Sequence, residues 1–170
     1  MATPSDRLFF VLQSWAKYVP FEAAARLRGF IYRPFFARVG RRLRIYDAVT
    51  IKYPGEITLG DHVTINSGSF LVGAGGLAIG SDVMIGAGTK IVTTAHGRSR
   101  TDVPMRLQEL EMQPIVIEED VWFGFDVKVL PGAVIRRGAV LGAGTVVGGE
   151  VPAFAIVAGV PGKVIGTRRS

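Results

Sequence analysis

The sequence predicts an all-β solenoid preceded by a short helical segment, and three observations support this prediction. An apolar residue returns every six positions, most regularly at Ile117, Phe123, Val129, Ile135, Leu141 and Val147. The residue four places after each of these positions is small or β-branched and never charged. The repeat is abandoned for a long stretch once, over residues 93–114.

A period of six fits neither regular secondary structure, because a helix repeats at 3.6 residues and a strand at 2. Short fixed repeats of this kind are typical of a parallel β-helix, in which three repeats make one triangular coil. The apolar residue of each repeat is expected to point inward and to stack on its counterpart in the next coil. The glycine that often follows it is expected to let the chain turn the corner, because glycine has no Cβ.

The N-terminal segment, residues 1–38, shows no six-residue repeat and predicts two helices. Ser5 is the expected N-cap of the first helix, which Pro20 ends, and the second runs from Phe21 to about Tyr32. We expect the two helices to cover the open end of the solenoid. We also expect a peripheral membrane contact, because Phe, Trp and Arg on short helices suit the membrane interface.

Composition limits the classes of chemistry and partner. The chain has 170 residues, no cysteine, a net charge of +6 and a sequence pI near 10.1. The absence of cysteine excludes disulfides, thiolate metal sites and cysteine nucleophiles. The positive charge suggests a nucleic acid or an anionic membrane as partner, but no nucleic-acid recognition motif accompanies it, so no nucleic acid is expected. The N-terminal apolar run is too short for a membrane span or a signal peptide, which favours a cytoplasmic location, including the inner membrane face.

Three parts follow from these patterns: a helical segment (1–38), the solenoid (39–165) and a basic tail (166–170). The interruption at 93–114 is the expected functional loop, because long loops in compact repeat domains are usually functional. It contains His96, whose imidazole can accept a proton from a hydroxyl near neutral pH. The other histidine, His62, lies at a coil corner, and we assign it no chemistry.

The loop and the repeats that follow it resemble a known family. They contain "TTAHG" in the loop, "VWFGFDVKVLPGAVI" after it and "LGAGTVVGGEVPAFAIVAGVPGKVI" near the end. These stretches resemble the hexapeptide-repeat acyltransferases, and most closely the sugar O-acetyltransferases, which include maltose and galactoside acetyltransferases and enzymes of bacterial surface polysaccharides. The resemblance, over roughly residues 59–165, implies a left-handed parallel β-helix, against the usual right-handed crossover rule. It also implies a homotrimer with the acceptor bound between subunits.

The resemblance implies an acetyl-CoA-dependent O-acetyltransferase that needs no metal. His96 matches the loop histidine that deprotonates the acceptor hydroxyl, which then attacks the thioester directly. A carboxylate often orients this histidine, and Glu109 and Glu111 both remain candidates. The acceptor is expected to be a saccharide of an exopolysaccharide, capsule or lipopolysaccharide pathway, either lipid-linked or polymeric. Asn66 and Arg106 match positions that bind such an acceptor.

The resemblance also implies a binding site for acetyl-CoA. Phe125 and Ala143 match positions that line the groove of the pantetheine arm, and Lys163 matches a basic residue near the nucleotide phosphates. Trp122 matches the Trp of a "VWIG" motif and is expected beside His96 at the donor site. The alternative for Trp122 is a buried aromatic on the inner face of the solenoid.

The sequence also bears on three other functions: a zinc hydratase, an N-acetyltransferase and a non-catalytic scaffold. A zinc hydratase of the γ-carbonic anhydrase type needs three histidine ligands, and the chain has two histidines. An amino-sugar N-acetyltransferase is the alternative enzyme, although such enzymes often carry a Gly-rich nucleotide-binding domain before the repeats, which residues 1–38 do not resemble. A non-catalytic scaffold is the alternative outside enzymes, because a fold alone does not prove activity.

Overall fold

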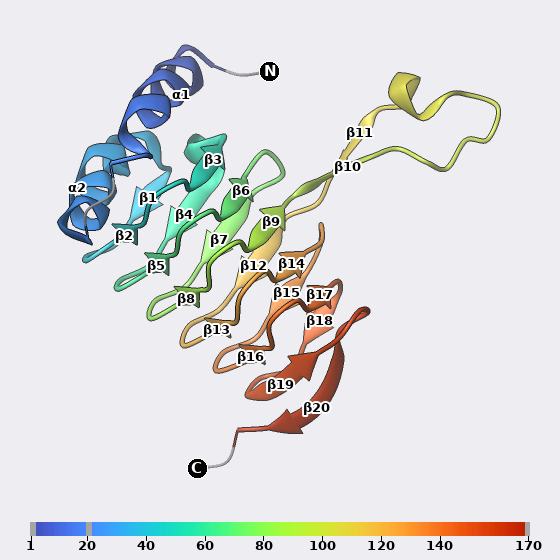
Figure 1. The fold of residues 1–170 in the computed structure, drawn as a ribbon. Helices are drawn as coiled ribbons and strands as arrows, with labels where there is room; N and C mark the ends of the chain where they lie inside the picture. The colour runs from blue at the N-terminus through green and yellow to red at the C-terminus, as the bar shows by residue number, and fades with distance from the viewer. Residues whose placement is uncertain (1–2, 20–21, 169–170) are drawn as a thin grey trace.

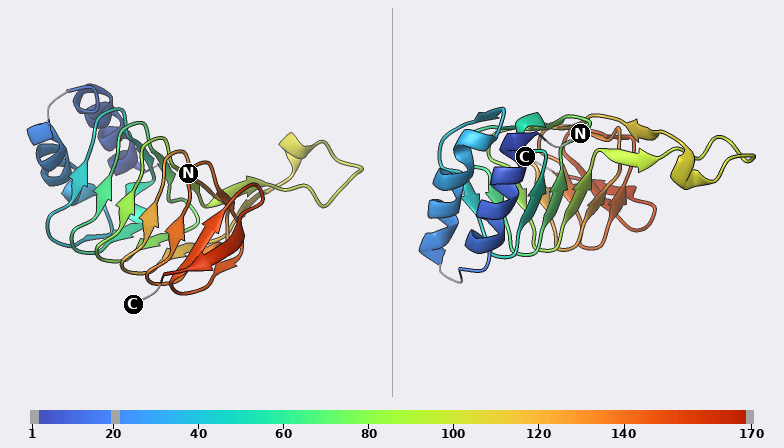
Figure 2. Two further views of the ribbon diagram at one scale, coloured as in Figure 1. Left: turned by 60° about the horizontal axis from the view of Figure 1, so that its bottom comes forward. Right: turned by 90° about the horizontal axis from the view of Figure 1, so that it is seen from above.

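The protein is a triangular prism of stacked coils, covered at its N-terminal end by two helices and carrying one long arm (Figures 1 and 2). The computed structural model describes residues 3–19 and 22–168. The predicted fold, a left-handed parallel β-helix of hexapeptide repeats, is confirmed. No helix among these residues is long and apolar enough to cross a bilayer.

Each face of the prism is one parallel sheet, with one strand from each coil. The first face is ordered β1 (Arg38–Val39), β4 (Ile57–Leu59), β7 (Leu77–Ile79), β12 (Ile115–Ile117), β15 (Val134–Ile135) and β18 (Glu150–Val151). The second face contains β2 (Arg44–Ile45), β5 (Thr64–Ile65), β8 (Met84–Ile85), β13 (Trp122–Phe123), β16 (Val140–Leu141) and β19 (Ala155–Ala158). The third face contains β3 (Thr50–Lys52), β6 (Phe70–Val72), β9 (Lys90–Val92), β14 (Lys128–Val129) and β17 (Val146–Val147).

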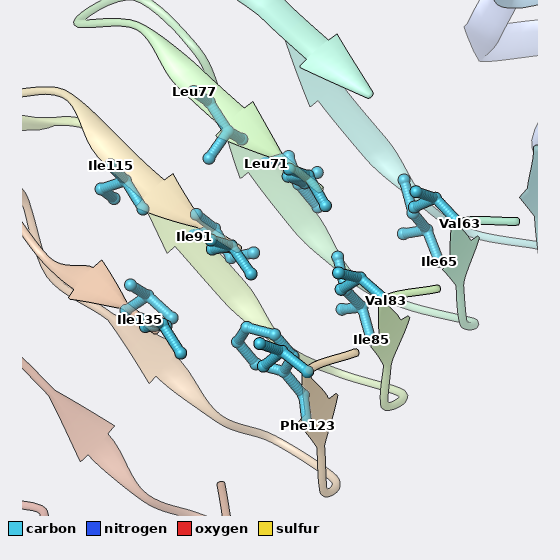
Figure 3. Close-up of a cluster of buried hydrophobic side chains, with 14 of the residues drawn as sticks. Val63, Ile65, Leu71, Leu77, Val83, Ile85, Ile91, Ile115, Phe123 and Ile135 are labelled. Atoms are coloured by element: carbon cyan, nitrogen blue, oxygen red, sulfur yellow. The ribbon is translucent and has the colours of Figure 1, made fainter. Parts of the chain in front are cut away.

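The core is the interior of the prism, where the apolar residue of each repeat stacks on the same position of the next coil. On the first face, for example, Leu59 pairs with Ile79, and Ile117 follows in the next coil. These side chains and their small or β-branched companions are buried, and Figure 3 shows them in superposed rows. Each large aliphatic side chain buried this way contributes roughly 1.5–3 kcal/mol, so the stacked rows hold the solenoid together.

The corners of the prism place two different requirements on the backbone. The residue three places after the inward one has a left-handed φ, and it is Gly88 (+75°) in one coil and Asp126 (+54°) in the next. The glycine directly after the inward residue, such as Gly86, has no left-handed φ. A Cβ on Gly86 would lie 2.6 Å from the carbonyl carbon of Gly124 in the next coil. This glycine is therefore required because a Cβ would collide with the next coil, whereas the left-handed turn of the corner belongs to the residue two places later.

Two helices make up the N-terminal segment. Helix α1 (Pro4–Ala16) begins with Thr3 as N-cap, because the Thr3 side chain accepts a hydrogen bond from the Asp6 amide and the Asp6 carboxylate accepts one from the Thr3 amide. The prediction of Ser5 as N-cap is therefore wrong by two residues. Helix α2 (Glu22–Tyr32) is followed by the 3-10 turn η1 (Arg33–Phe35). The predicted break at Pro20 and helix start at Phe21 lie outside the described residues.

The helices cover the first coil, as expected, and they do so with polar as well as apolar contacts. Phe9 is buried and packs edge-to-face on Tyr32, with ring centroids 5.1 Å apart. Gln13 is buried and pairs with the main chain of Ile51, donating to its carbonyl (3.1 Å) and accepting from its amide (2.7 Å). The buried guanidinium of Arg28 donates to the Ile45 carbonyl at 2.7 Å. Because buried polar groups need partners, these bonds fix the helices in one position on the coil.

Tyr32 provides a test of this packing. Its hydroxyl is buried and has no hydrogen-bond partner among the described residues. Burial raises the pKa of Tyr32 to about 12, against a smaller opposing effect of Arg28. Because the folded state retains the phenol proton longer than the unfolded chain, the contribution to stability is complete below about pH 10 and is lost as pH rises toward about 12.

We therefore expect Tyr32→Phe to be at least as stable as the wild type at neutral pH, because it removes an unpaired buried hydroxyl. The variant should also lose less stability between about pH 9 and 12. Urea denaturation at a series of pH values measures both effects. A lower urea midpoint for the variant at neutral pH would show that the hydroxyl has a stabilising partner.

The C-terminal end of the prism is closed by an antiparallel strand. β20 (Lys163–Thr167) folds back on β19, and Ala158 pairs with Lys163 in the register. The strand extends two residues beyond 165, the predicted limit of the solenoid. Of the tail predicted at 166–170, residues 166 and 167 therefore belong to a strand, and residues 169 and 170 lie outside the described residues.

Candidate active site

The interrupted repeat forms an arm that projects from the corner after β9. β10 (Thr94–His96) and β11 (Leu110–Met112) pair as an antiparallel ribbon, and Figures 1 and 2 show it pointing away from the prism. Thr93 anchors its base, because the buried hydroxyl donates to the Val72 carbonyl (2.8 Å) and accepts from the Gly75 amide (2.8 Å). The ribbon therefore leaves the prism from a fixed point.

His96 lies in the ribbon and is exposed. Its main chain pairs with Leu110, and its imidazole makes no side-chain hydrogen bond or ion pair with any described residue. Opposed residues of an antiparallel pair share one face of the ribbon, and alternate residues lie on the same side. His96 therefore shares its face with Leu110 and Met112, two exposed apolar side chains.

The two candidate carboxylates for His96 lie on the other side of the ribbon. Glu111 pairs with Ala95, the residue before His96, and therefore lies on the opposite face. Glu109, two residues before Glu111, follows the same alternation, and its carbonyl accepts a hydrogen bond from the Gly97 amide at 3.0 Å. Within one chain, neither carboxylate is placed to orient the imidazole.

The tip of the arm is held by hydrogen bonds of its own. The Gln108 side chain donates to the carbonyls of Arg100 (2.8 Å) and Val103 (2.9 Å). The hydrogen-bonded Arg100 guanidinium lowers the pKa of Asp102, so this pair neutralises itself. Arg106 lies in the 3-10 turn η3 (Met105–Leu107), is exposed and has no ion-pair partner among the described residues. Its guanidinium is therefore available to an anionic group outside the chain.

The other predicted site residues gather at a different edge, the corner between the second and third faces. Asn66 follows β5 there, and its side-chain amide donates to the Ile85 carbonyl of the next coil at 2.8 Å. Phe125 and Ala143 occupy equivalent positions in adjacent coils, where the Gly144 amide donates to the Phe125 carbonyl at 2.8 Å. Lys163 pairs with Ala158 at the end of this edge formed by β19 and β20. We call this row of Asn66, Phe125, Ala143 and Lys163 the donor edge, after the predicted role of its last three residues.

Trp122 lies beside the donor edge and is half exposed. It belongs to β13 on the second face, between Met84 and Val140 of the neighbouring strands. The inner-face alternative for Trp122 is wrong, because its neighbour Phe123 is the buried aromatic of that coil. The expected position beside His96 is not formed within one chain, because the arm leaves from another corner.

The structure therefore brings some predicted residues together and keeps others apart. The donor edge contains Asn66, Phe125, Ala143 and Lys163. Asn66 and Arg106 were both predicted to bind the acceptor, but within one chain Arg106 lies elsewhere. His96 and Arg106 lie together on the arm. No group of three or more His, Cys, Asp or Glu side chains within the described part of the chain is arranged to hold a metal ion.

Sequence reasoning missed one feature of the arm. Four apolar side chains on it are exposed by more than half: Met105, Leu107, Leu110 and Met112. Met105 and Leu107, and likewise Leu110 and Met112, are two residues apart, but two positions are too short an alternation to predict a strand from the sequence. Only the paired ribbon shows that Leu110 and Met112 share a face with His96.

Comparisons with known proteins agree with this architecture. The profile of the bacterial transferase hexapeptide family (six repeats) matches residues 114–149. The putative colanic acid biosynthesis acetyltransferase WcaF of Escherichia coli is 33% identical over 143 residues, which cover 84% of this chain and 76% of the relative. The putative lipopolysaccharide biosynthesis O-acetyl transferase WbbJ of the same species is 33% identical over 138 residues, covering 77% and 67%.

A solved structure extends the similarity to almost the whole chain. The hexapeptide-repeat containing acetyltransferase of Vibrio cholerae, complexed with acetyl coenzyme A, superposes with a TM-score of 0.85 at 27% identity, covering 98% of this chain and 88% of that one. The chain belongs to the hexapeptide-repeat acetyltransferases. The prediction of an acyltransferase enzyme is thus confirmed at the level of the family.

Proposed function

We propose that the protein transfers an acetyl group from acetyl-CoA to a saccharide hydroxyl in the biosynthesis of a bacterial surface or exported polysaccharide, and that His96 is the general base. The similarity to WcaF and WbbJ over most of the chain supports the class of acceptor. The observation that carries the proposal is the exposed, unpaired His96 imidazole on an arm that the fold holds away from its own prism. Location in the cytoplasm, where this chemistry would occur, stays a prediction.

His96 suits proton transfer because its imidazole has no competing partner within the described chain. In the proposed reaction, the imidazole accepts the proton of the acceptor hydroxyl while the oxygen attacks the thioester carbonyl. The C–S bond then breaks, and the leaving sulfur of CoA takes that proton from the imidazolium. Backbone amides are the donors that would stabilise the negative charge on the thioester oxygen. No covalent intermediate with the protein is needed, consistent with a chain that has no cysteine.

The arm is proposed to complete its site on a second copy of the chain, in a homotrimer. The exposed apolar side chains beside His96 support this, because Leu110 and Met112 are 53% and 58% exposed on the face that holds the imidazole. Burying such a face against a neighbour is favourable by about 25 cal/mol per Å² of apolar surface. An arm seated on the donor edge of the next subunit would bring His96 to Asn66 and Trp122.

The donor edge fits an extended thioester substrate. Gly86, Gly124 and Gly142 are stacked in successive coils at this corner, so no side chain projects from these three positions of the edge. Lys163 supplies a cation at one end, as phosphate groups require. Neighbouring lysines are less available, because hydrogen bonds from Lys128 and Lys90 lower the pKa of Asp126 and hold it as their anionic partner.

The proposal is tested by incubating the protein with acetyl-CoA and a panel of acceptors while free CoA is measured. The panel contains neutral sugars, amino sugars and polysaccharide repeat units. We expect CoA release with at least one saccharide hydroxyl and an ester-linked acetyl group in the product. An alkali-stable amide product would assign the protein to amino-sugar N-acetylation, and no release with any acceptor would contradict the proposal.

A further inference from the structure

We propose that the two N-terminal helices form a docking surface for an anionic lipid bilayer, and that lipid phosphates enter an arginine-lined cavity between α2 and the first coil. This surface lies at the N-terminal end of the prism, away from the arm (Figures 1 and 2). The inference adds a partner to the protein and does not depend on the proposed acetyl transfer.

The positive charge of the protein is concentrated at this end. Residues 1–46 contain nine Lys and Arg against two Asp and Glu, whereas the remaining residues contain eleven against twelve. The net charge of the whole chain therefore arises from the helical segment and the first coil. A charge this one-sided creates a local positive potential that attracts anionic surfaces.

A cavity of about 510 Å³ lies within this basic end, lined by four arginines: Arg26, Arg33, Arg42 and Arg44. No carboxylate lines the cavity, and none of the four arginines forms an ion pair with any residue in 3–19 or 22–168. Arg33 donates to the Val39 carbonyl at 2.7 Å, which holds its guanidinium in place. Guanidinium groups bind phosphate oxygens with two parallel hydrogen bonds, so the cavity has the chemistry of a phosphate site.

Each helix also carries a second apolar stripe that does not face the core. On α1, Phe9 and Gln13 are buried, while Leu8, Val11 and Trp15 are exposed at a spacing of three and four residues. Trp15 is 81% exposed. Residues at this spacing lie on one face of a helix, and that face is about two fifths of a turn away from the buried one. Helix α1 therefore presents a continuous apolar strip to its surroundings.

The stripe on α2 joins the apolar and basic parts of the surface. Leu27 and Phe30 are three residues apart and are 55% and 76% exposed. Phe30 also lines the arginine cavity, together with Arg26 of α2 and Arg33 of η1. One surface thus combines aromatic side chains with cations that have no anionic partner in the described chain.

A bilayer accounts for both properties. Aromatic and aliphatic side chains on a short helix enter the headgroup region, while arginines beside them pair with anionic headgroups. A nucleic acid would satisfy the arginines, but it would leave the outward stripe of Leu8, Val11 and Trp15 exposed to water. The combination therefore favours an anionic bilayer over a nucleic acid.

The test is flotation of the full chain with vesicles of phosphatidylcholine alone or mixed with phosphatidylglycerol. We expect binding to the mixed vesicles at low salt, little binding to phosphatidylcholine, and release as salt screens the charges. The double variant Arg26→Gln/Arg42→Gln should lower the partition coefficient on the order of 30-fold, at about fivefold per charge. Trp15→Ala should lower it by about tenfold through lost apolar burial.

The matched control for one charge is Arg137→Gln in the C-terminal half, which should bind vesicles like the wild type, whereas Arg26→Gln alone should lower the partition coefficient about fivefold. No flotation with anionic vesicles, or equal losses in Arg137→Gln and in the cavity variant, would overturn the proposal. Binding of glycerol phosphate or an oligonucleotide without flotation would also overturn it and assign the arginines to a soluble anion. Release of CoA with a soluble acceptor is measured on the same variants and should be unchanged, which separates failure of docking from failure of the proposed reaction.

Discussion

Replacing His96 with alanine is expected to lower the rate of CoA release by about 100- to 10,000-fold, because a positioned general base contributes rate factors of this size. The folded structure should be unaffected, since the imidazole is exposed and makes no side-chain hydrogen bond within the described chain. The measurements are the steady-state rate with the preferred acceptor and the thermal midpoint of each protein. The rate should fall while the midpoint remains the same.

The other histidine provides the control. His62 has a left-handed φ of +58°, and its Nδ1 lies 2.9 Å from the Asp82 carboxylate. Asparagine tolerates this backbone conformation, so His62→Asn should retain wild-type rates. Equal losses in the two variants, or full activity of His96→Ala, would remove His96 from the reaction.

The His96→Ala variant also tests whether the active site lies between subunits. A mixture of His96→Ala with a variant of the donor edge, Lys163→Ala, should recover part of the activity if one subunit provides the arm and its neighbour the edge. Each protein alone should remain impaired. No recovery after the subunits have been exchanged would place both groups in one chain, against the arrangement proposed for the arm.

Replacing Gly86 with alanine is expected to destabilise the solenoid by roughly 1–3 kcal/mol or more, the usual cost of overpacking. The added Cβ would lie 2.6 Å from the Phe123 carbonyl oxygen and from the Gly124 carbonyl carbon. Both are backbone atoms of the next coil, so no side chain can rotate away to make room. For a domain of this size, the thermal midpoint should fall by roughly 2–10 °C.

Gly55 provides the matched control for this substitution. It lies in the 3-10 turn η2 (Pro54–Glu56), and a Cβ there would meet nothing closer than the Phe35 carbonyl oxygen at 4.0 Å. Gly55→Ala should therefore leave stability unchanged or raise it slightly, because alanine restricts the unfolded chain. A Gly86→Ala variant as stable as Gly55→Ala would show that neighbouring coils can separate at no cost.

The core of the solenoid was predictable because its contacts repeat. Ile65 and Ile85 meet the same type of neighbour as Phe123 and Leu141, so one period in the sequence reports every coil. The long interruption was predictable for the same reason, since a break is visible against a regular pattern. The N-cap at Thr3 was missed because two residues on either side of Pro4, Thr3 and Ser5, both suit a helix start and only the capping bonds distinguish them.

Amino-acid order alone was enough to predict the parallel coils and their inward rows, because they depend on a local pattern that recurs along the chain, and to locate the long loop around His96, where that pattern breaks. The close approach of coils at Gly86, the separation of the arm from the donor edge, and the joint face of His96, Leu110 and Met112 became known only from the folded chain. These features depend on how segments distant in sequence are placed in space. No repeat encodes that placement, since it results from packing between coils and from main-chain pairing across the arm.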